Sequence, residues 1–262
     1  MESVRSQDGT RIVYRRRGAG PPLVLVHGMA AANPVDWPAA EALATRFTLY
    51  GVDRRGRRAS GDGSSYTLAR EAEDVAAVMD ALDPPAFLLG HSFGGLCALE
   101  AALLTANIRK LVLYEPFITP APGERIYRAE VVDHLQALLD KGDEEAVILT
   151  FYRDVARLSP DAVAGLRDSP QWPDRLAAAP TIVREIRADD AYAFDATRFD
   201  AMNTPTLLLL GGDSSESERR TAETLDASLP NSRITVLPGA DHLGMYTAPE
   251  LFAEYVASFL NA

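Results

Sequence analysis

The chain has 262 residues, of which 47% are hydrophobic and 24% charged, a composition that fits a folded globular protein and excludes a largely disordered one. Its formal net charge of −11 argues against binding to nucleic acid, which requires a basic surface, and against attachment to an anionic membrane. The N-terminal segment lacks the apolar run of a secretory signal, and no run approaches the roughly 20 residues that span a bilayer, so we expect a cytoplasmic protein.

Short apolar runs that indicate strands alternate with helical patterns along most of the chain. The runs at 21–28 and 204–213 are continuous and contain glycine at or near their ends, which is typical of buried strands. In chain order we predict strands over 12–18 and 21–28, a helix over 37–47, a strand over 48–56, a helix over 67–82, a strand over 86–92, a helix over 93–106, strands over 108–117 and 204–213, a helix over 216–229, a strand over 232–242 and a helix over 249–260. This alternation predicts an α/β fold with a mostly parallel central sheet flanked by helices.

Residues 118–200 interrupt this alternation. Three segments there have helical patterns, and prolines separate them, but none resembles a strand. We therefore predict a core formed by 1–117 and 201–262, with a helical subdomain over 118–200 inserted between two strands of the sheet. The predicted helices lie in 124–142, 143–158 and 177–188.

Ser92 is the candidate nucleophile, because it lies in the pattern G-x-S-x-G between a predicted strand and a predicted helix. Gly90 and Gly94 would let the backbone turn sharply, so that the serine side chain protrudes. The start of the helix would add a positive dipole end near a developing oxyanion. The alternative is a glycine-rich turn that only allows a helix to pack close to a strand. Cys97, in the predicted helix, is expected to be a small packing residue in either case.

A catalytic serine needs a base and an acid that orients the base. Of the four histidines, only His242 lies on a loop after a late strand, and we predict that it is the general base. We predict that the carboxylate of Asp213, just past the apolar run and its two glycines in 204–213, orients His242. Glu115 is the competing acid, since it also ends a predicted sheet strand.

The oxyanion that forms during acyl transfer needs two backbone N–H donors. One is expected from Phe93, the residue after the nucleophile. The other is expected from Met29, in the loop after the strand at 21–28, where His27 is expected to fix the loop by hydrogen bonding.

With these residues in place, the chain resembles the α/β-hydrolase superfamily over nearly its whole length. The motifs "HGM", "GHSFGG", "LLLLGGDSS" and "GADH" occur in the superfamily's order Ser, Asp, His. The resemblance is to a capped, serine esterase-like member, and it implies that the helical cap lies between the sixth and seventh strands. The segment 53–62 resembles the superfamily's D-x-R-G-x-G-x-S, with Arg58 in place of the second glycine, and we expect a structural role with its arginines solvated or in salt bridges.

The expected function is a serine hydrolase that cleaves a carboxylic ester, lactone or thioester through an acyl-enzyme on Ser92. We expect no cofactor and no metal, a fairly apolar small-molecule acyl substrate, and a monomer or homodimer. The alternatives are other chemistry on the same fold (a perhydrolase or cofactor-free haloperoxidase, a C–C bond hydrolase, or biosynthetic acyl transfer or cyclisation) and a non-catalytic ligand-binding protein.

Overall fold

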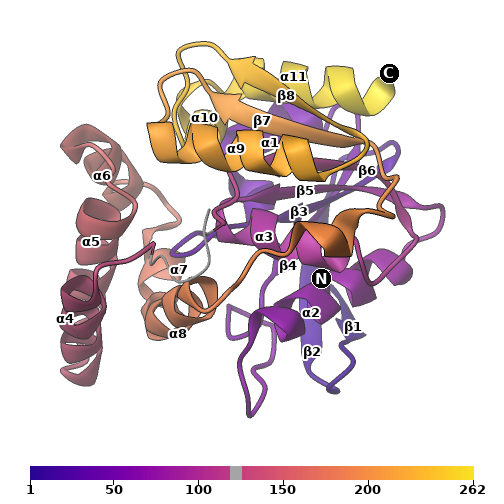
Figure 1. The fold of residues 1–262 in the computed structure, drawn as a ribbon. Coiled ribbons are helices and arrows are strands. Elements are labelled where there is room, and N and C mark those ends of the chain that lie inside the picture. The colour runs from indigo at the N-terminus through magenta and orange to yellow at the C-terminus, as the bar shows by residue number, and fades with distance from the viewer. Residues whose placement is uncertain (119–125) are drawn as a thin grey trace.

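A central sheet of eight strands organises the computed structural model, which describes residues 1–118 and 126–262 (Figure 1). The strand order is β1-β2-β4-β3-β5-β6-β7-β8. β1 pairs antiparallel with β2 and β2 with β4, while the pairs from β4 to β8 are parallel. The predicted mostly parallel sheet is therefore confirmed. The strands are β1 (Glu2–Arg5), β2 (Arg11–Arg17), β3 (Pro22–Val26), β4 (Thr48–Asp53), β5 (Ala86–His91), β6 (Ile108–Tyr114), β7 (Thr206–Gly211) and β8 (Ser232–Leu237).

Helices cover both faces of the sheet, because β3, β5 and β7 are buried along their whole length and have apolar side chains on each side. One buried cluster joins α2 (Leu68–Asp80), α3 (Phe93–Ala101) and α9 (Glu216–Ser228) to the sheet. The other joins α1 (Pro38–Leu43) and α11 (Pro249–Asn261) to the opposite face. Thr67 caps the amino end of α2, since its side chain accepts a hydrogen bond from the Arg70 amide.

Between β6 and β7 the described chain contains helices and no strand. Figure 1 shows α4, α5 and α6 standing together to one side of the sheet, with α7 and α8 closer to it. The prediction for 118–200 falls partly on residues 119–125, which lie outside the described residues, and the boundaries of a separate subdomain stay a prediction. These inserted helices are α4 (Ala129–Asp140), α5 (Glu144–Thr150), the π-helical turn η2 (Phe151–Val155), α6 (Pro160–Arg167), α7 (Trp172–Leu176) and α8 (Ala179–Asp190), followed by the 3-10 turn η3 (Ala196–Phe199).

Two short elements complete the core. The 3-10 turn η1 (Pro34–Asp36) precedes α1, and α10 (Gly244–Thr247) precedes α11. None of the helices in the described ranges is long and apolar enough to cross a membrane. The cytoplasmic location stays a prediction.

Candidate active site

Ser92 occupies the turn between β5 and α3, at the carboxyl end of a central strand. Its backbone has φ 54° and ψ −129°, a left-handed conformation that is unfavourable for any residue with a Cβ. Its amide donates to the Tyr114 carbonyl oxygen at 2.9 Å, which ties the turn to the neighbouring strand β6. The hydroxyl is therefore presented at the amino end of α3 by a strained turn.

The loop after β3 lies directly beside this turn. A Cβ placed on Gly28 would come within 2.9 Å of the Ser92 Cβ, so the two backbones are close. Met29 and Phe93, the predicted oxyanion donors, line the same cavity as Ser92. Phe93 is the first residue of α3, so its amide has no partner within the helix.

Buried groups hold the loop of Met29 from behind. His27 is fully enclosed, and its Nδ1 donates to the Gly28 carbonyl oxygen at 2.8 Å, in line with the role predicted for it. Arg54 donates to the carbonyl oxygens of His27 and Gly28 at 3.4 and 3.2 Å. The guanidinium of Arg54 also lies 4.7 Å from the centre of the Phe93 ring. One buried cation thus contacts both segments that carry the candidate oxyanion donors.

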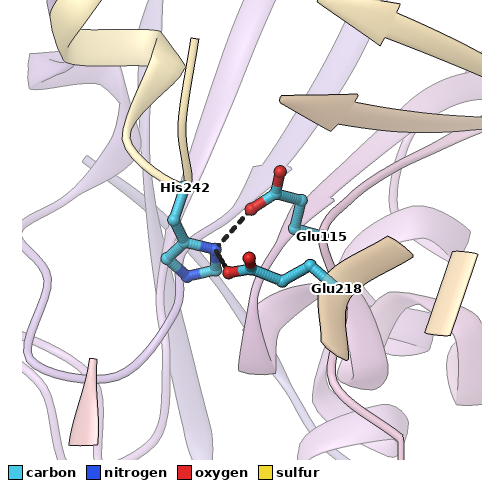
Figure 2. A group of neighbouring side chains, drawn as sticks. All are labelled: Glu115, Glu218 and His242. Atoms are coloured by element: carbon cyan, nitrogen blue, oxygen red, sulfur yellow. Dashed lines mark hydrogen bonds and ion pairs between the residues drawn. The ribbon is translucent and has the colours of Figure 1, made fainter. Parts of the chain in front are cut away.

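His242 lies between β8 and α10, and its partner is a carboxylate at the end of β6. Its Nδ1 donates to Glu115 Oε2 at 2.7 Å (Figure 2). The other oxygen of Glu115 accepts from the Gly211 amide at 2.7 Å and from the Ser214 hydroxyl at 2.5 Å. Burial opposes ionisation of Glu115, but these hydrogen bonds and the charge of His242 lower its pKa below the ordinary value.

The predicted partner of His242 was Asp213, and the structure does not bring these two side chains together. Asp213 is exposed, and its carboxylate makes no hydrogen bond with the described part of the chain, although it lines the same cavity. Its backbone amide donates to the Ala240 carbonyl oxygen at 2.9 Å. Glu115 has a positive φ of 46° at the turn after β6, and its carboxylate contacts the imidazole of His242. The geometry therefore corrects the choice between the two acids in favour of Glu115.

A second carboxylate lies beside the same imidazole. Glu218, in the first turn of α9, places Oε1 3.4 Å from His242 Nδ1 (Figure 2). Burial and the nearby charge of Glu115 raise the pKa of Glu218. Glu218 was not singled out from the sequence, because it lies three residues after Ser215. This is the spacing of an ordinary capping box at the start of a helix, and the structure contains that box.

Ser92 and His242 both line a cavity of about 460 Å³ that is closed on one side by the inserted helices. No hydrogen bond joins their side chains in the described structure, a common finding where substrate is absent. His91 does not face Ser92 as a base. It is buried, and its Nε2 contacts the His242 carbonyl oxygen at 2.9 Å. Cys97 is buried, as predicted, and His134 is exposed on α4.

A family model described as "Alpha/beta hydrolase family" matches residues 23–255, which is most of the chain. The chain belongs to the α/β hydrolase family. The match begins in β3 and ends in α11, so it includes Ser92, Glu115 and His242.

Known hydrolases resemble this chain over nearly their full length. A crystal structure of an α/β hydrolase from Sphaerobacter thermophilus is 35% identical, covers 99% of this chain and 100% of its own, and has a TM-score of 0.82. A pimeloyl-[acyl-carrier protein] methyl ester esterase from Serratia marcescens is 28% identical over 97% of this chain and 99% of that protein. A 2-(acetamidomethylene)succinate hydrolase from Mesorhizobium japonicum is 26% identical over 95% of this chain and 91% of that protein. These relatives support hydrolysis, and the esterase supports hydrolysis of an ester.

Three neighbouring side chains of this α/β hydrolase carry atoms of the kind that bind metal ions. Glu115, Glu218 and His242 could each offer one ligand atom, and these atoms lie within 4.8 Å of one another. Two carboxylates and one imidazole would suit zinc in number and type. The Nδ1 of His242 already has Glu115 as its partner, however, which is the arrangement that orients a catalytic imidazole. The expectation that no metal is needed stays a prediction.

Gly94 offers a test of how tightly the turn of this α/β hydrolase is packed. A Cβ on Gly94 would lie 2.4 Å from the His27 carbonyl oxygen, and this oxygen belongs to backbone that cannot move aside. We expect Gly94→Ala to destabilise the protein by about 1–3 kcal/mol and to lower esterase activity. Gly165→Ala, in α6 with open space around it, is the matched control and should be neutral or stabilising by about 0.5–1 kcal/mol. Urea unfolding checks both values, and equal effects would contradict the packing argument.

Proposed function

We propose that this chain is a serine hydrolase that cleaves carboxylic esters through an acyl-enzyme on Ser92. The observation that carries the proposal is the hydrogen bond of 2.7 Å between His242 Nδ1 and Glu115, in a cavity whose wall also presents Ser92 from a strained turn. This is the constellation of nucleophile, base and acid that acyl transfer requires. The acid in the proposal is Glu115, and thioesters and lactones fall within the same chemistry.

In this mechanism His242 takes the proton of Ser92 while the serine oxygen attacks the ester carbonyl. Glu115 keeps the Nδ1–H of the imidazole directed toward itself, so that Nε2 is free to accept the proton, and it stabilises the imidazolium. The amides of Met29 and Phe93 hold the oxyanion. His242 then protonates the departing alcohol, and a water molecule, activated by the same imidazole, hydrolyses the acyl-enzyme.

A covalent serine probe tests this proposal. We expect a fluorophosphonate to label the wild type at Ser92 and not to label Ser92→Ala. Hydrolysis of p-nitrophenyl acetate by Ser92→Ala should fall by at least about 10³-fold, because the nucleophile and its proton relay act as one unit. Mass spectrometry of the labelled peptide identifies the site.

Two other kinds of protein, the ligand-binding protein weighed from the sequence and a hydrolase that does not use Ser92, predict different results. A ligand-binding protein would show neither labelling nor hydrolysis. A hydrolase with another nucleophile would retain hydrolysis in Ser92→Ala. Either outcome would overturn the proposal. Ser217→Ala, which changes another hydroxyl of the cavity lining that contacts none of the proposed catalytic residues, is the control for non-specific labelling.

A further inference from the structure

Arg175 is a buried cation in the wall of the candidate active-site cavity. It lies on α7, and only 2% of its surface is exposed. The cavity that it lines also contains Ser92 and His242. The proposed serine mechanism gives this guanidinium no role.

All the hydrogen bonds of Arg175 within the described chain go to neutral oxygens. Its Nη1 donates to the Ala30 carbonyl oxygen at 3.2 Å and to the Tyr152 hydroxyl at 3.0 Å. Its Nη2 donates to the Tyr246 hydroxyl at 2.8 Å. Its Nε is buried and has no hydrogen-bond partner. Since a guanidinium has five N–H donors and three of them are used, two donors of Arg175 make no hydrogen bond with the described chain.

No carboxylate of the described residues pairs with Arg175, unlike the other fully buried arginines. Arg54 contacts Glu71 at 2.7 Å, and Arg57 contacts Glu185 at 2.7 Å. A buried charge without a counter-charge is costly, because burial removes its hydration and nothing replaces it. Arg128 and Arg157 also line the cavity, but both are exposed and keep their hydration. Arg175 is the buried cation of this wall, and an anionic ligand would supply the counter-charge that it lacks.

The acids that line the cavity do not take this place. Burial, opposed by a hydrogen bond from Tyr127, raises the pKa of Asp189 to about 7, so this carboxyl is substantially protonated near neutral pH. Asp213, Glu218 and Asp241 belong to the segments that follow β7 and β8, on the side of His242. Asp154, the fifth acid of the cavity lining, pairs with Arg153. None of these five acids forms an ion pair with Arg175 within the described residues.

We propose that Arg175 is an anion subsite and that the preferred ester substrates carry a carboxylate close to the scissile carbonyl. The guanidinium contacts the carbonyl oxygen of Ala30, the residue after the candidate oxyanion donor Met29. A carboxylate that reaches Nε or the free N–H of Nη2 must therefore be only a few bonds from the reacting carbon. Half-esters of short dicarboxylic acids have this chemistry. The inference rests on the proposed esterase function and names its substrate class.

The test compares monomethyl succinate with dimethyl succinate, which differ in the one free carboxylate. We expect the wild type to favour the half-ester in kcat/KM. Arg175→Met should lower kcat/KM for the half-ester about 10- to 100-fold, the worth of a hydrogen bond to a charged group, mainly through a higher KM. The value for the diester should change by less than about 3-fold. Arg167→Met, at an exposed position on α6, is the control and should change neither.

A binding measurement separates this inference from the proposed function. Calorimetry should detect succinate binding to Ser92→Ala and not to the double variant Ser92→Ala/Arg175→Met, whereas Arg175→Lys should retain part of the binding. Absence of succinate binding to Ser92→Ala would overturn the inference. So would an equal loss of activity on both esters, since Arg175 would then serve only to hold the Ala30 loop. If the proposed function is wrong, the wild type will hydrolyse neither ester, but succinate binding will still be measurable.

Discussion

Glu115→Gln is expected to lower kcat for ester hydrolysis by roughly 10³- to 10⁴-fold, while Asp213→Asn changes it by less than about 3-fold. A glutamine oxygen can still accept from the Gly211 amide, so the fold should persist. Its NH₂ group would then face His242 Nδ1 and force the proton to Nε2. An imidazole in that form cannot accept the proton of Ser92. Steady-state kinetics on p-nitrophenyl acetate measures both changes.

The pH dependence of the same variants gives a second readout. Burial disfavours the imidazolium of His242, but the hydrogen bond and charge of Glu115, followed by Glu218, raise its pKa above the ordinary 6.5. The base must be neutral, so kcat/KM falls as the pH drops below this raised pKa. Glu115→Gln removes the largest of the raising influences, and the acid limb should move to lower pH. Asp213→Asn should leave the limb in place.

Glu218 provides the control for this pair. Its Oε1 lies 3.4 Å from His242 Nδ1, so it can supply part of the charge that Glu115→Gln removes. We expect Glu218→Gln alone to have a small effect and the double variant to lose more activity than Glu115→Gln. The assignment of the acid is wrong if Asp213→Asn abolishes turnover and Glu115→Gln does not.

The sequence was sufficient to predict the sheet and its helices, because continuous apolar strands and helical spacing are local signals. Gly90 is an example, since a Cβ there would lie 2.5 Å from the Gly94 carbonyl oxygen, and only glycine allows this close approach. The strand β1 was not predicted, because its four residues are mostly exposed and polar and pair only at the sheet edge. An edge strand of this kind has no buried side to produce a pattern.

The acid of the candidate site could not be chosen from the sequence alone. Glu115 and Asp213 both follow buried strands, and which carboxylate reaches His242 depends on backbone angles after the strand. Glu115 takes a positive φ, and Asp213 follows two glycines that lead it to the surface. Such angles arise from tertiary packing. The superfamily's order Ser, Asp, His favours Asp213, whereas the geometry favours Glu115.

The burial of the arginines in the segment 53–62 also could not be predicted from the sequence. A structural role with salt-bridged arginines was predicted, but burial of these pairs was not. Arg54, Arg55 and Arg57 are each at most 4% exposed. Arg58 replaces the usual glycine and still adopts a positive φ of 46°, with its guanidinium paired to Asp174 on α7. Charged residues are rarely buried, so a sequence reading places them in solvent unless their partners are known.

Glu185→Ala is expected to destabilise the protein by about 3–5 kcal/mol, because it leaves the buried Arg57 without its carboxylate partner and removes one of the two carboxylates beside Arg54. Glu185 lies on α8 and is fully buried. Its Oε1 lies 2.7 Å from Arg57 Nη2 and 3.4 Å from Arg54 Nη2. Burial favours the neutral acid, but the two guanidinium groups outweigh it and lower the pKa of Glu185, so it is charged at neutral pH.

The matched control is Glu145→Ala, which removes another Glu–Arg pair of the inserted helices. Glu145 and its partner Arg167 are 44% and 56% exposed, so their pair should contribute less than about 1 kcal/mol. Urea unfolding with a common slope measures both variants. A loss for Glu185→Ala no larger than the control's would contradict the argument.

Because Arg54 also contacts the His27–Gly28 backbone and the Phe93 ring, Glu185→Ala should lower kcat in the protein that remains folded, whereas Glu145→Ala should not. A helix inserted between two strands would thereby stabilise the loop that carries Met29, the candidate oxyanion donor.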